Sequence, residues 1–103
     1  MDGRRQVDGC SNLSVLKLNG WDVSKITDMD KSFQGCKNLT ELNLEGWDVS
    51  NASVIGIFSG CDKLTKLNLK NWKLPLSLAG MFTNFKGLKF VDLSGWDLSK
   101  TVD

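Results

Sequence analysis

The sequence predicts an α/β repeat protein: a solenoid of four rungs, with a parallel β-sheet on one face and short helical turns or loops on the other. Three observations predict this fold. Four tryptophans recur at intervals of 26, 25 and 24 residues, at Trp21, Trp47, Trp72 and Trp96. Each of them closes the same apolar pattern. A unit of about 25 residues cannot bury its apolar face alone, so neighbouring units have to stack.

The repeats divide the chain into a lead-in and four rungs of a single domain. The lead-in covers residues 1–8, and the rungs cover 9–34, 35–59, 60–83 and 84–103. The sequence stops soon after the Trp-Asp-Leu-Ser segment of rung 4, so that rung lacks its second half. A chain of 103 residues is long enough for one core of this kind.

The first half of each rung predicts a short strand. Rung 2 reads Leu39-x-x-Leu42-x-Leu44-x-x-Trp47, in which inward leucines alternate with outward polar residues. The same pattern begins at Leu13, Leu64 and Leu88, with Val91 as the one valine in a leucine position. A turn follows each strand. Gly20, Gly46 and Gly95 allow a positive φ there, and Asn71 is the next best residue for it.

The second half of each rung predicts a short return segment. Ile26, Met29 and Phe33 have helical spacing in rung 1, and the nearby acids Asp28 and Asp30 suit a helix start. The rungs shorten by one residue at a time, which favours short helical or 3₁₀ turns over long helices.

Composition and charge exclude several kinds of partner. The net charge is +1, and no run of like charges is longer than Arg4-Arg5, so we expect no nucleic-acid binding. No apolar stretch approaches the ~18 residues of a membrane-spanning helix, so we expect no membrane insertion. The polar start of the chain carries no secretion signal or anchor.

The chemistry of the side chains predicts a protein that is not an enzyme and that carries no cofactor. Histidine is absent, which removes the commonest general base and a common zinc ligand. A four-rung slab offers no deep cleft in which two carboxylates could face each other. A calcium site at Asp22, Asp28, Asp30 and Asp48 is disfavoured, because calcium loops space their acids more densely. We therefore expect no metal.

The cysteines and the Trp-Asp pairs each allow more than one interpretation. Cys10, Cys36 and Cys61 are expected to form a column of buried, reduced thiols, although a disulfide between adjacent rungs is geometrically possible and would leave one thiol over. The tryptophans are expected to close the core at a corner, with the following aspartate capping the next turn. The alternative is an exposed aromatic stripe that binds sugar.

The repeat resembles a known family. Its leucine pattern is that of leucine-rich repeats, with Trp in the Asn/Cys position. The unit from Phe33 to Ser50, which contains Gly35-Cys36 and Gly46-Trp47, resembles the 26-residue repeat of BspA-like bacterial surface proteins. This resemblance covers residues 9–103. It implies a non-enzymatic module for adhesion or protein binding that is extracellular or on the cell surface.

Two surfaces are candidates for function. The first is the strand face, formed by the outward residues of the strands, because extended faces of this kind bind partners in repeat proteins. The contacts expected on it are Glu41, Asn43, Glu45, Lys66, Asn68, Lys70, Phe90 and Asp92. Glu41 beside Lys66, and Glu45 beside Lys70, are also expected to fix the strand register.

The second candidate surface is the end rung. Its apolar residues have almost no sequence after them to cover them; they are Leu88, Val91, Leu93, Trp96 and Leu98. An uncovered end would expose apolar surface and a bare strand edge, and a second copy of the chain could cover both. The alternative function is therefore a self-assembly unit, a homodimer or higher oligomer joined through its ends.

Overall fold

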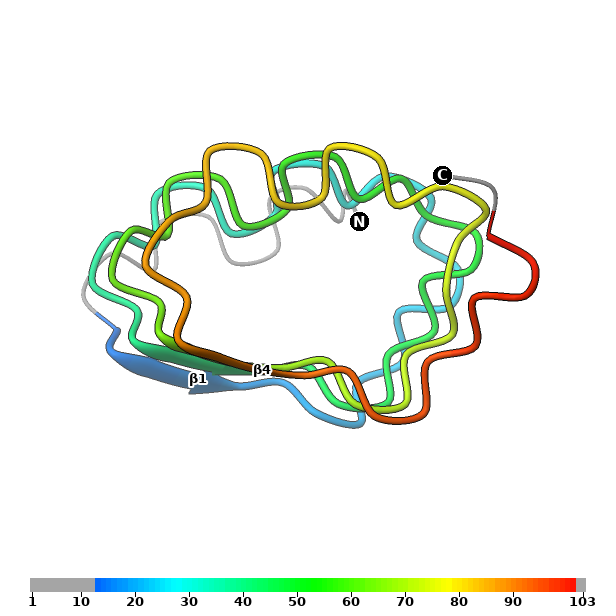
Figure 1. Cartoon of the computed structure of the whole chain (residues 1–103), viewed down its shortest axis with the longest axis horizontal. Coiled ribbons are helices and arrows are strands. Elements are labelled where there is room, and N and C mark those ends of the chain that lie inside the picture. The colour runs from blue at the N-terminus through cyan, green and yellow to red at the C-terminus, as the bar shows by residue number, and fades with distance from the viewer. Residues whose placement is uncertain (1–12, 102–103) are drawn as a thin grey trace.

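The computed structural model describes residues 13–101, which contain one four-stranded parallel sheet. The strands are β1 (Val15–Lys17), β2 (Glu41–Asn43), β3 (Lys66–Asn68) and β4 (Phe90–Asp92). They lie in the order β1-β2-β3-β4, so each strand pairs with the strand of the next rung (Figure 1). The predicted parallel sheet, with one strand from each rung, is confirmed.

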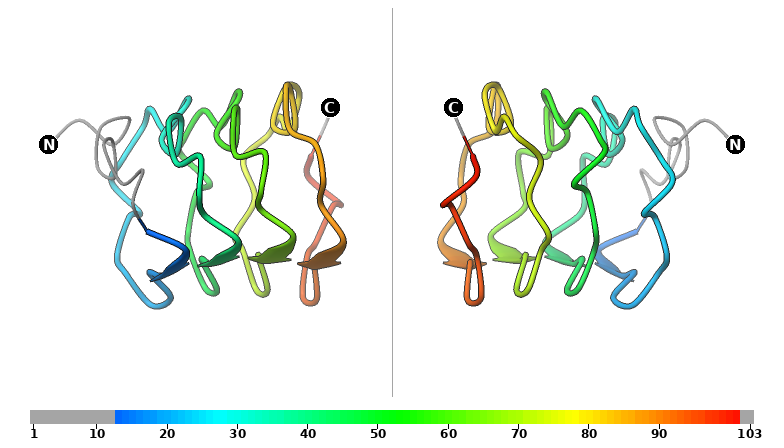
Figure 2. Two further views of the ribbon diagram at one scale, coloured as in Figure 1. Left: turned by 90° about the vertical axis from the view of Figure 1, so that its left-hand side faces the viewer. Right: turned by 90° about the vertical axis from the view of Figure 1, so that its right-hand side faces the viewer.

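The rungs stack along one axis, and equivalent residues of adjacent rungs lie side by side (Figures 1 and 2). Leu16, Leu42, Leu67 and Val91 are partners in the sheet register. Beyond each strand the pairing continues: the amide of Leu18 donates to the carbonyl of Asn43 at 2.8 Å, and that of Leu44 donates to Asn68 at 2.9 Å. Along the strands and just beyond them, the chain thus satisfies its backbone groups between rungs.

No helix forms within residues 13–101, so the helical turns expected on the return side are not observed there. Each return segment is a run of turns. Ser32 donates to the carbonyl of Met29, Ile57 to Val54 and Met81 to Leu78, each at 3.2 Å. Other return-side amides bond across rungs instead, as Met29 does to Ser53 at 2.8 Å. Since those donors are used between rungs, they are lost to the i−4 bonds of a helix.

The core is a set of side-chain columns that run along the stack. Phe33 and Phe58 have ring centroids 6.1 Å apart, and Phe58 and Phe82 are also 6.1 Å apart. The side chains of Leu42, Leu44 and other apolar residues of rungs 2 and 3 are fully buried. The inner rungs are therefore covered on both sides by their neighbours, whereas among residues 13–101 the outer rungs have a neighbour on one side.

The turn after each strand has the predicted backbone. Gly20, Gly46, Asn71 and Gly95 all have positive φ, at 80°, 81°, 62° and 81°. Asparagine tolerates this region better than most residues, which explains how rung 3 keeps the same turn without glycine.

Candidate binding surface

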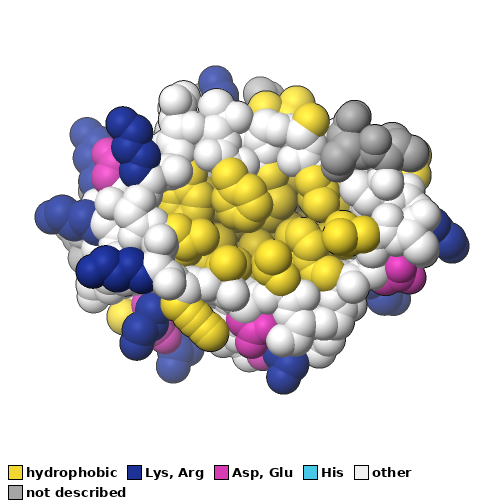
Figure 3. Space-filling model, in the orientation of Figure 1, with side chains coloured by type: hydrophobic (Ala, Val, Ile, Leu, Met, Phe, Trp, Pro, Cys, Tyr) yellow, Lys and Arg dark blue, Asp and Glu magenta, His cyan; other side chains and the backbone are white. Residues whose placement is uncertain are grey.

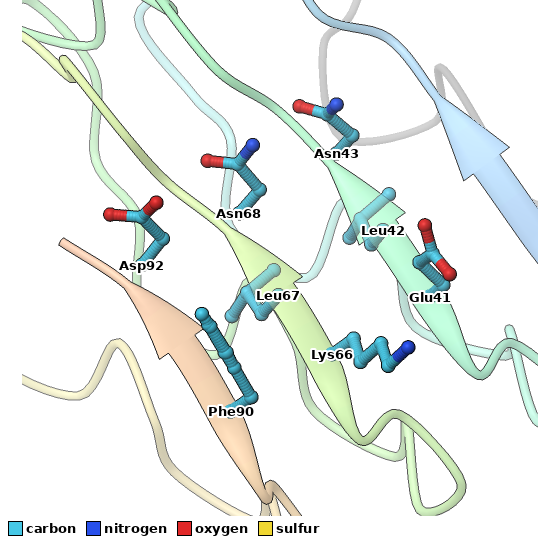
Figure 4. Close-up of a pocket in the computed structure, with 8 residues that line it drawn as sticks. All are labelled: Glu41, Leu42, Asn43, Lys66, Leu67, Asn68, Phe90 and Asp92. Carbon is cyan, nitrogen blue, oxygen red and sulfur yellow. The ribbon is translucent and has the colours of Figure 1, made fainter. Parts of the chain in front are cut away.

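The strand face carries a shallow hollow over β2, β3 and β4. Its volume is about 390 Å³, and it is lined by Glu41, Leu42, Asn43, Lys66, Leu67, Asn68, Phe90 and Asp92. Figure 4 shows these side chains in rows that cross the three strands. Six of the eight predicted contacts thus come together in one place. Glu45 and Lys70, the other two, lie just beyond the strands and do not line the hollow.

One row of the hollow is mixed in character. Glu41 is the register partner of Lys66, which in turn is the partner of Phe90. This confirms the predicted neighbourhood of Glu41 and Lys66. No ion pair joins the two side chains in the part of the chain that the structure describes, so their charges remain open to a ligand. Phe90 is 52% exposed, and it adds an apolar edge to the row.

The second row consists of polar side chains that hydrogen-bond to the backbone of their own rung. The side-chain oxygen of Asn43 accepts a hydrogen bond from the amide of Glu45 at 3.0 Å, and that of Asn68 accepts one from Lys70 at 2.9 Å. Asp92 accepts one from the amide of Ser94 at 2.9 Å. Each of these is an Asx turn, in which the side chain replaces a backbone acceptor as the strand ends.

Glu45 lies beside Lys70, as expected, since the amide of Gly46 donates to the carbonyl of Lys70 at 2.9 Å. Its carboxylate, however, accepts a hydrogen bond from the side-chain amide of Asn68 at 3.3 Å. The Asn68 side chain therefore uses its oxygen on Lys70 and its nitrogen on Glu45. Sequence patterning missed this role of Asn68. The Asn or Asp that ends β2, β3 and β4 is the signal from which the Asx turns could have been found.

The carboxylate of Asp92 is held in its charged form. The hydroxyl and the backbone amide of Ser94 both donate to it, and these bonds lower the pKa of Asp92, with a smaller contribution from the positive charge of Lys70. Hydrogen bonds to a carboxylate favour its ionised state. The hollow therefore offers a fixed negative charge at its β4 side.

The tryptophans close the core at a corner, as predicted, and do not form an exposed stripe. Trp47 and Trp72 are buried, and their rings stack with centroids 6.4 Å apart. The indole nitrogen of each donates to a carbonyl of the preceding rung: Trp47 to Leu18 at 2.8 Å, Trp72 to Leu44 at 2.8 Å and Trp96 to Leu69 at 2.7 Å. Trp21 differs, because it is 49% exposed.

The aspartates that follow the tryptophans cap turns, as expected. Asp22 accepts hydrogen bonds from the amide and hydroxyl of Ser24, and Asp48 accepts them from Ser50. These bonds lower the pKa of both carboxyls. Within residues 13–101 no three acidic or cysteine side chains gather where a metal ion could bind.

The expectation of three reduced thiols is wrong for Cys36, which is disulfide-bonded. Cys10 lies outside the described residues. Cys61 is a free, buried thiol that donates to the carbonyl of Phe33 at 3.4 Å. Burial raises the pKa of Cys61 to about 11, and the charge of Asp62 adds to this shift.

The end rung presents an apolar face. Leu93 is 40% exposed and Leu98 is 58% exposed, whereas Leu88, Val91 and Trp96 are half-buried against the core. Phe82, which is 44% exposed, extends this face onto the return side. Figure 3 looks onto this end of the stack and shows apolar side chains gathered at its centre. All five predicted residues thus belong to the last rung, with only part of their surface buried.

These features define a repeat-like protein built on a single parallel sheet. The chain matches over residues 2–103 the family described as Mycoplasma protein of unknown function, DUF285, and it belongs to that family. No curated protein and no solved structure matches the chain. Within residues 13–101 there is no helix long and apolar enough to cross a membrane.

Proposed function

We propose that this chain is a leucine-rich-repeat solenoid of the BspA-like kind, which serves as a non-enzymatic protein-binding or adhesion module of a surface or secreted protein. The leucine and tryptophan pattern supports the repeat type, and the in-register parallel strands agree with it. The partner binds through the strand face, and neither a metal nor a cofactor takes part.

The observation that carries this proposal is the hollow over β2, β3 and β4. It combines a carboxylate at Glu41, an ammonium group at Lys66 and a half-exposed aromatic ring at Phe90, above strand backbone whose leucines point into the core. A peptide offers the matching groups: apolar side chains, charges of both signs and backbone hydrogen-bonding groups. Exposed aromatic rings such as Phe90 supply a large apolar contact area to a partner.

Peptide display tests the proposal directly. A random peptide library is selected on the wild-type chain and counter-selected on the double variant Lys66→Glu, Phe90→Ser. Enriched peptides are then titrated by fluorescence anisotropy. The expected result is a set of peptides whose affinity falls at least tenfold on the double variant. Lys37→Glu, which makes the same charge change on an exposed turn off the strand face, serves as the matched control.

Failure takes two recognisable forms. If no peptide is enriched on the wild type over the double variant, the strand face is not a peptide-binding surface. If Lys37→Glu weakens the enriched peptides as much as the double variant does, binding follows net charge and not the hollow. Circular dichroism of each variant shows that the fold is kept.

The apolar end rung favours a second candidate, self-assembly through the ends of the stack. Leu93 and Leu98 are exposed there, and in the inner rungs the leucine equivalent to Leu93 is buried, as Leu44 and Leu69 show. Light scattering over a tenfold concentration range is expected to show a mass that grows, and Leu93→Lys is expected to return it to the monomer. A constant monomer mass for the wild type would exclude this candidate.

A further inference from the structure

The structure assigns a specific partner and orientation to the end surfaces: a second copy of this chain, bound head to tail, with β4 of one copy beside β1 of the next in parallel and in register. This inference rests on the second candidate function, self-assembly. The inference adds which two surfaces meet, the head-to-tail direction of the contact, and the register of the two strands.

Backbone hydrogen bonding gives the first support. Between each pair of adjacent rungs, the backbone amide of the third leucine in the repeat (Leu18, Leu44 or Leu69) donates to a backbone carbonyl of the next rung. Leu69 donates to Asp92 in this way at 3.0 Å. The amide two residues later does the same, as Asn71 does to Ser94 at 2.8 Å. At the end of the stack the equivalent donors are the amides of Leu93 and Gly95, and neither makes a hydrogen bond within the described residues.

The acceptors that those donors need are at the other end of the molecule. In rung 1 the carbonyls of Lys17 and Asn19 occupy the positions that Asp92 and Ser94 occupy in rung 4. β1 has β2 as its partner on one side, and its other edge has no partner strand among the described residues. A second copy placed head to tail supplies a donor for each acceptor.

The tryptophan column gives a second, independent match. Each inner indole donates to the carbonyl of the third leucine of the rung before it. Trp21 makes no such bond within the described residues and is half exposed, while the Leu93 carbonyl accepts no indole. In the head-to-tail arrangement Trp21 stacks on Trp96 of the neighbouring copy and donates to its Leu93.

Charge selects the polarity of the contact. Each strand and the residue two places beyond it present three outward side chains. Their net charge is +1 in rung 1, from Lys17, and −2 in rung 2, from Glu41 and Glu45. It is +2 in rung 3, from Lys66 and Lys70, and −1 in rung 4, from Asp92. The sign therefore alternates along the stack. A head-to-tail copy continues this alternation, because Asp92 meets Lys17, whereas a contact between two first rungs brings like charges together.

The outer apolar residues match in the same register. Val15 and Phe90 are 46% and 52% exposed, and they occupy the strand position at which the inner rungs carry Glu41 and Lys66. Head-to-tail contact makes these two apolar side chains neighbours. At the corner Asp97 comes beside Asp22, but Lys100 and Lys25 follow these aspartates and keep both corners neutral.

An interface of this kind does not close. Each copy uses a different surface at each of its two ends, so every added copy leaves one free end of each type. The product is a linear stack in which the strand face runs continuously from copy to copy.

Disulfide trapping tests the polarity and the register. Val15→Cys and Phe90→Cys are made in separate chains, and both positions are exposed enough to accept the change. In-register neighbours in a parallel sheet lie ~5 Å apart, within the range of a disulfide. After mild oxidation, an equimolar mixture is expected to give at least tenfold more cross-linked dimer than either variant alone. The native Cys61 is buried and Cys36 is already bonded, so neither competes.

A mixture of Glu41→Cys and Lys66→Cys chains is the matched control, because those positions lie in inner rungs and do not meet in an end-to-end stack. Cross-linking of Val15→Cys with itself, or of Phe90→Cys with itself, at the level of the mixture would overturn the head-to-tail polarity while leaving self-assembly intact. A wild-type chain that stays monomeric by light scattering at 1 mM would overturn both. Neither result bears on peptide binding by the strand face.

Discussion

The indole nitrogen of Trp72 donates a 2.8 Å hydrogen bond to the carbonyl oxygen of Leu44, one rung earlier in the stack. The same carbonyl also accepts the backbone amide of Trp47 at 3.3 Å. One buried oxygen therefore joins the turn of its own rung to the aromatic corner of the next. The indoles of Trp47 and Trp96 donate in the same way to the carbonyls of Leu18 and Leu69, so the tryptophan column is a hydrogen-bonded ladder as well as an apolar one.

The first prediction concerns this ladder. Trp72→Phe removes the indole donor and part of the buried ring, and we expect it to lower the free energy of unfolding by about 2 kcal/mol. Trp21→Phe is the matched control, because Trp21 is 49% exposed and its change should cost less than about 0.5 kcal/mol. Urea titration followed by circular dichroism measures both. Equal losses for the two variants would mean that the hydrogen bond adds nothing to stability.

The second prediction separates the two roles of Asn68. Asn68→Ala removes the acceptor of its Asx turn with Lys70 and the donor to Glu45, and we expect a loss of about 1 kcal/mol in urea titration. Asn68→Asp keeps the acceptor, as Asp92 does in the same position of rung 4. The aspartate variant loses only the donor to Glu45 and gains repulsion from that carboxylate, so its loss should be about half that of the alanine variant, ~0.5 kcal/mol. The aspartate variant is thus the better probe of the strand face, since it changes charge without removing the turn.

The third prediction follows from the turn-capping aspartates. The pKa of Asp48 is lowered from its ordinary 3.8 by hydrogen bonds from Ser50, and those of Asp22, Asp92 and Asp97 are lowered in the same way. A carboxyl whose pKa is lower in the folded state stabilises the fold above its unfolded pKa. That contribution is lost as the pH falls through the folded pKa. We therefore expect the urea midpoint to be flat from pH 7 to 5 and to fall below about pH 4.

Asp48→Asn tests that cause. Asparagine keeps the acceptor for the Ser50 amide but does not titrate, so the variant should lose less stability than wild type between pH 5 and pH 3. A variant with the same pH dependence as wild type would assign the acid sensitivity to other groups.

The sequence was sufficient for the parts of the fold that depend on repetition. The leucine spacing predicted the strands, and Gly20, Gly46, Asn71 and Gly95 predicted the positive φ after them. Stacking equivalent positions also brought Glu41, Lys66 and Phe90 into one row of the candidate surface. Repetition constrains these residues several times over, because each rung has to match its neighbours.

The parts that depend on competition between hydrogen bonds could not be predicted. Met29 has helical spacing with Phe33, but its amide bonds to Ser53 in the next rung, and a run of turns stands where a short helical or 3₁₀ turn is expected. The repeat pattern places Glu45 beside Lys70, but the Glu45 carboxylate accepts its hydrogen bond from the side-chain amide of Asn68. The spacing of a sequence repeat predicts the direction of a side chain. It does not predict which of two nearby groups a hydrogen-bond donor or acceptor will pair with.

The last prediction concerns the free thiol. Cys61 is fully buried, and burial raises its pKa to about 11, so at pH 8 it is protonated and shielded from reagents. We expect iodoacetamide to modify Cys61 in the native chain at least a hundredfold more slowly than in the chain unfolded in urea without a reductant. The ordinary pKa of the thiol is 9.0, so the burial of the protonated form stabilises the fold below that pH, and this contribution is lost as the pH rises towards 11. Mass spectrometry of the modified chain measures the rate. Fast native modification would mean that the start of rung 3 opens far more often than the full burial of Cys61 implies.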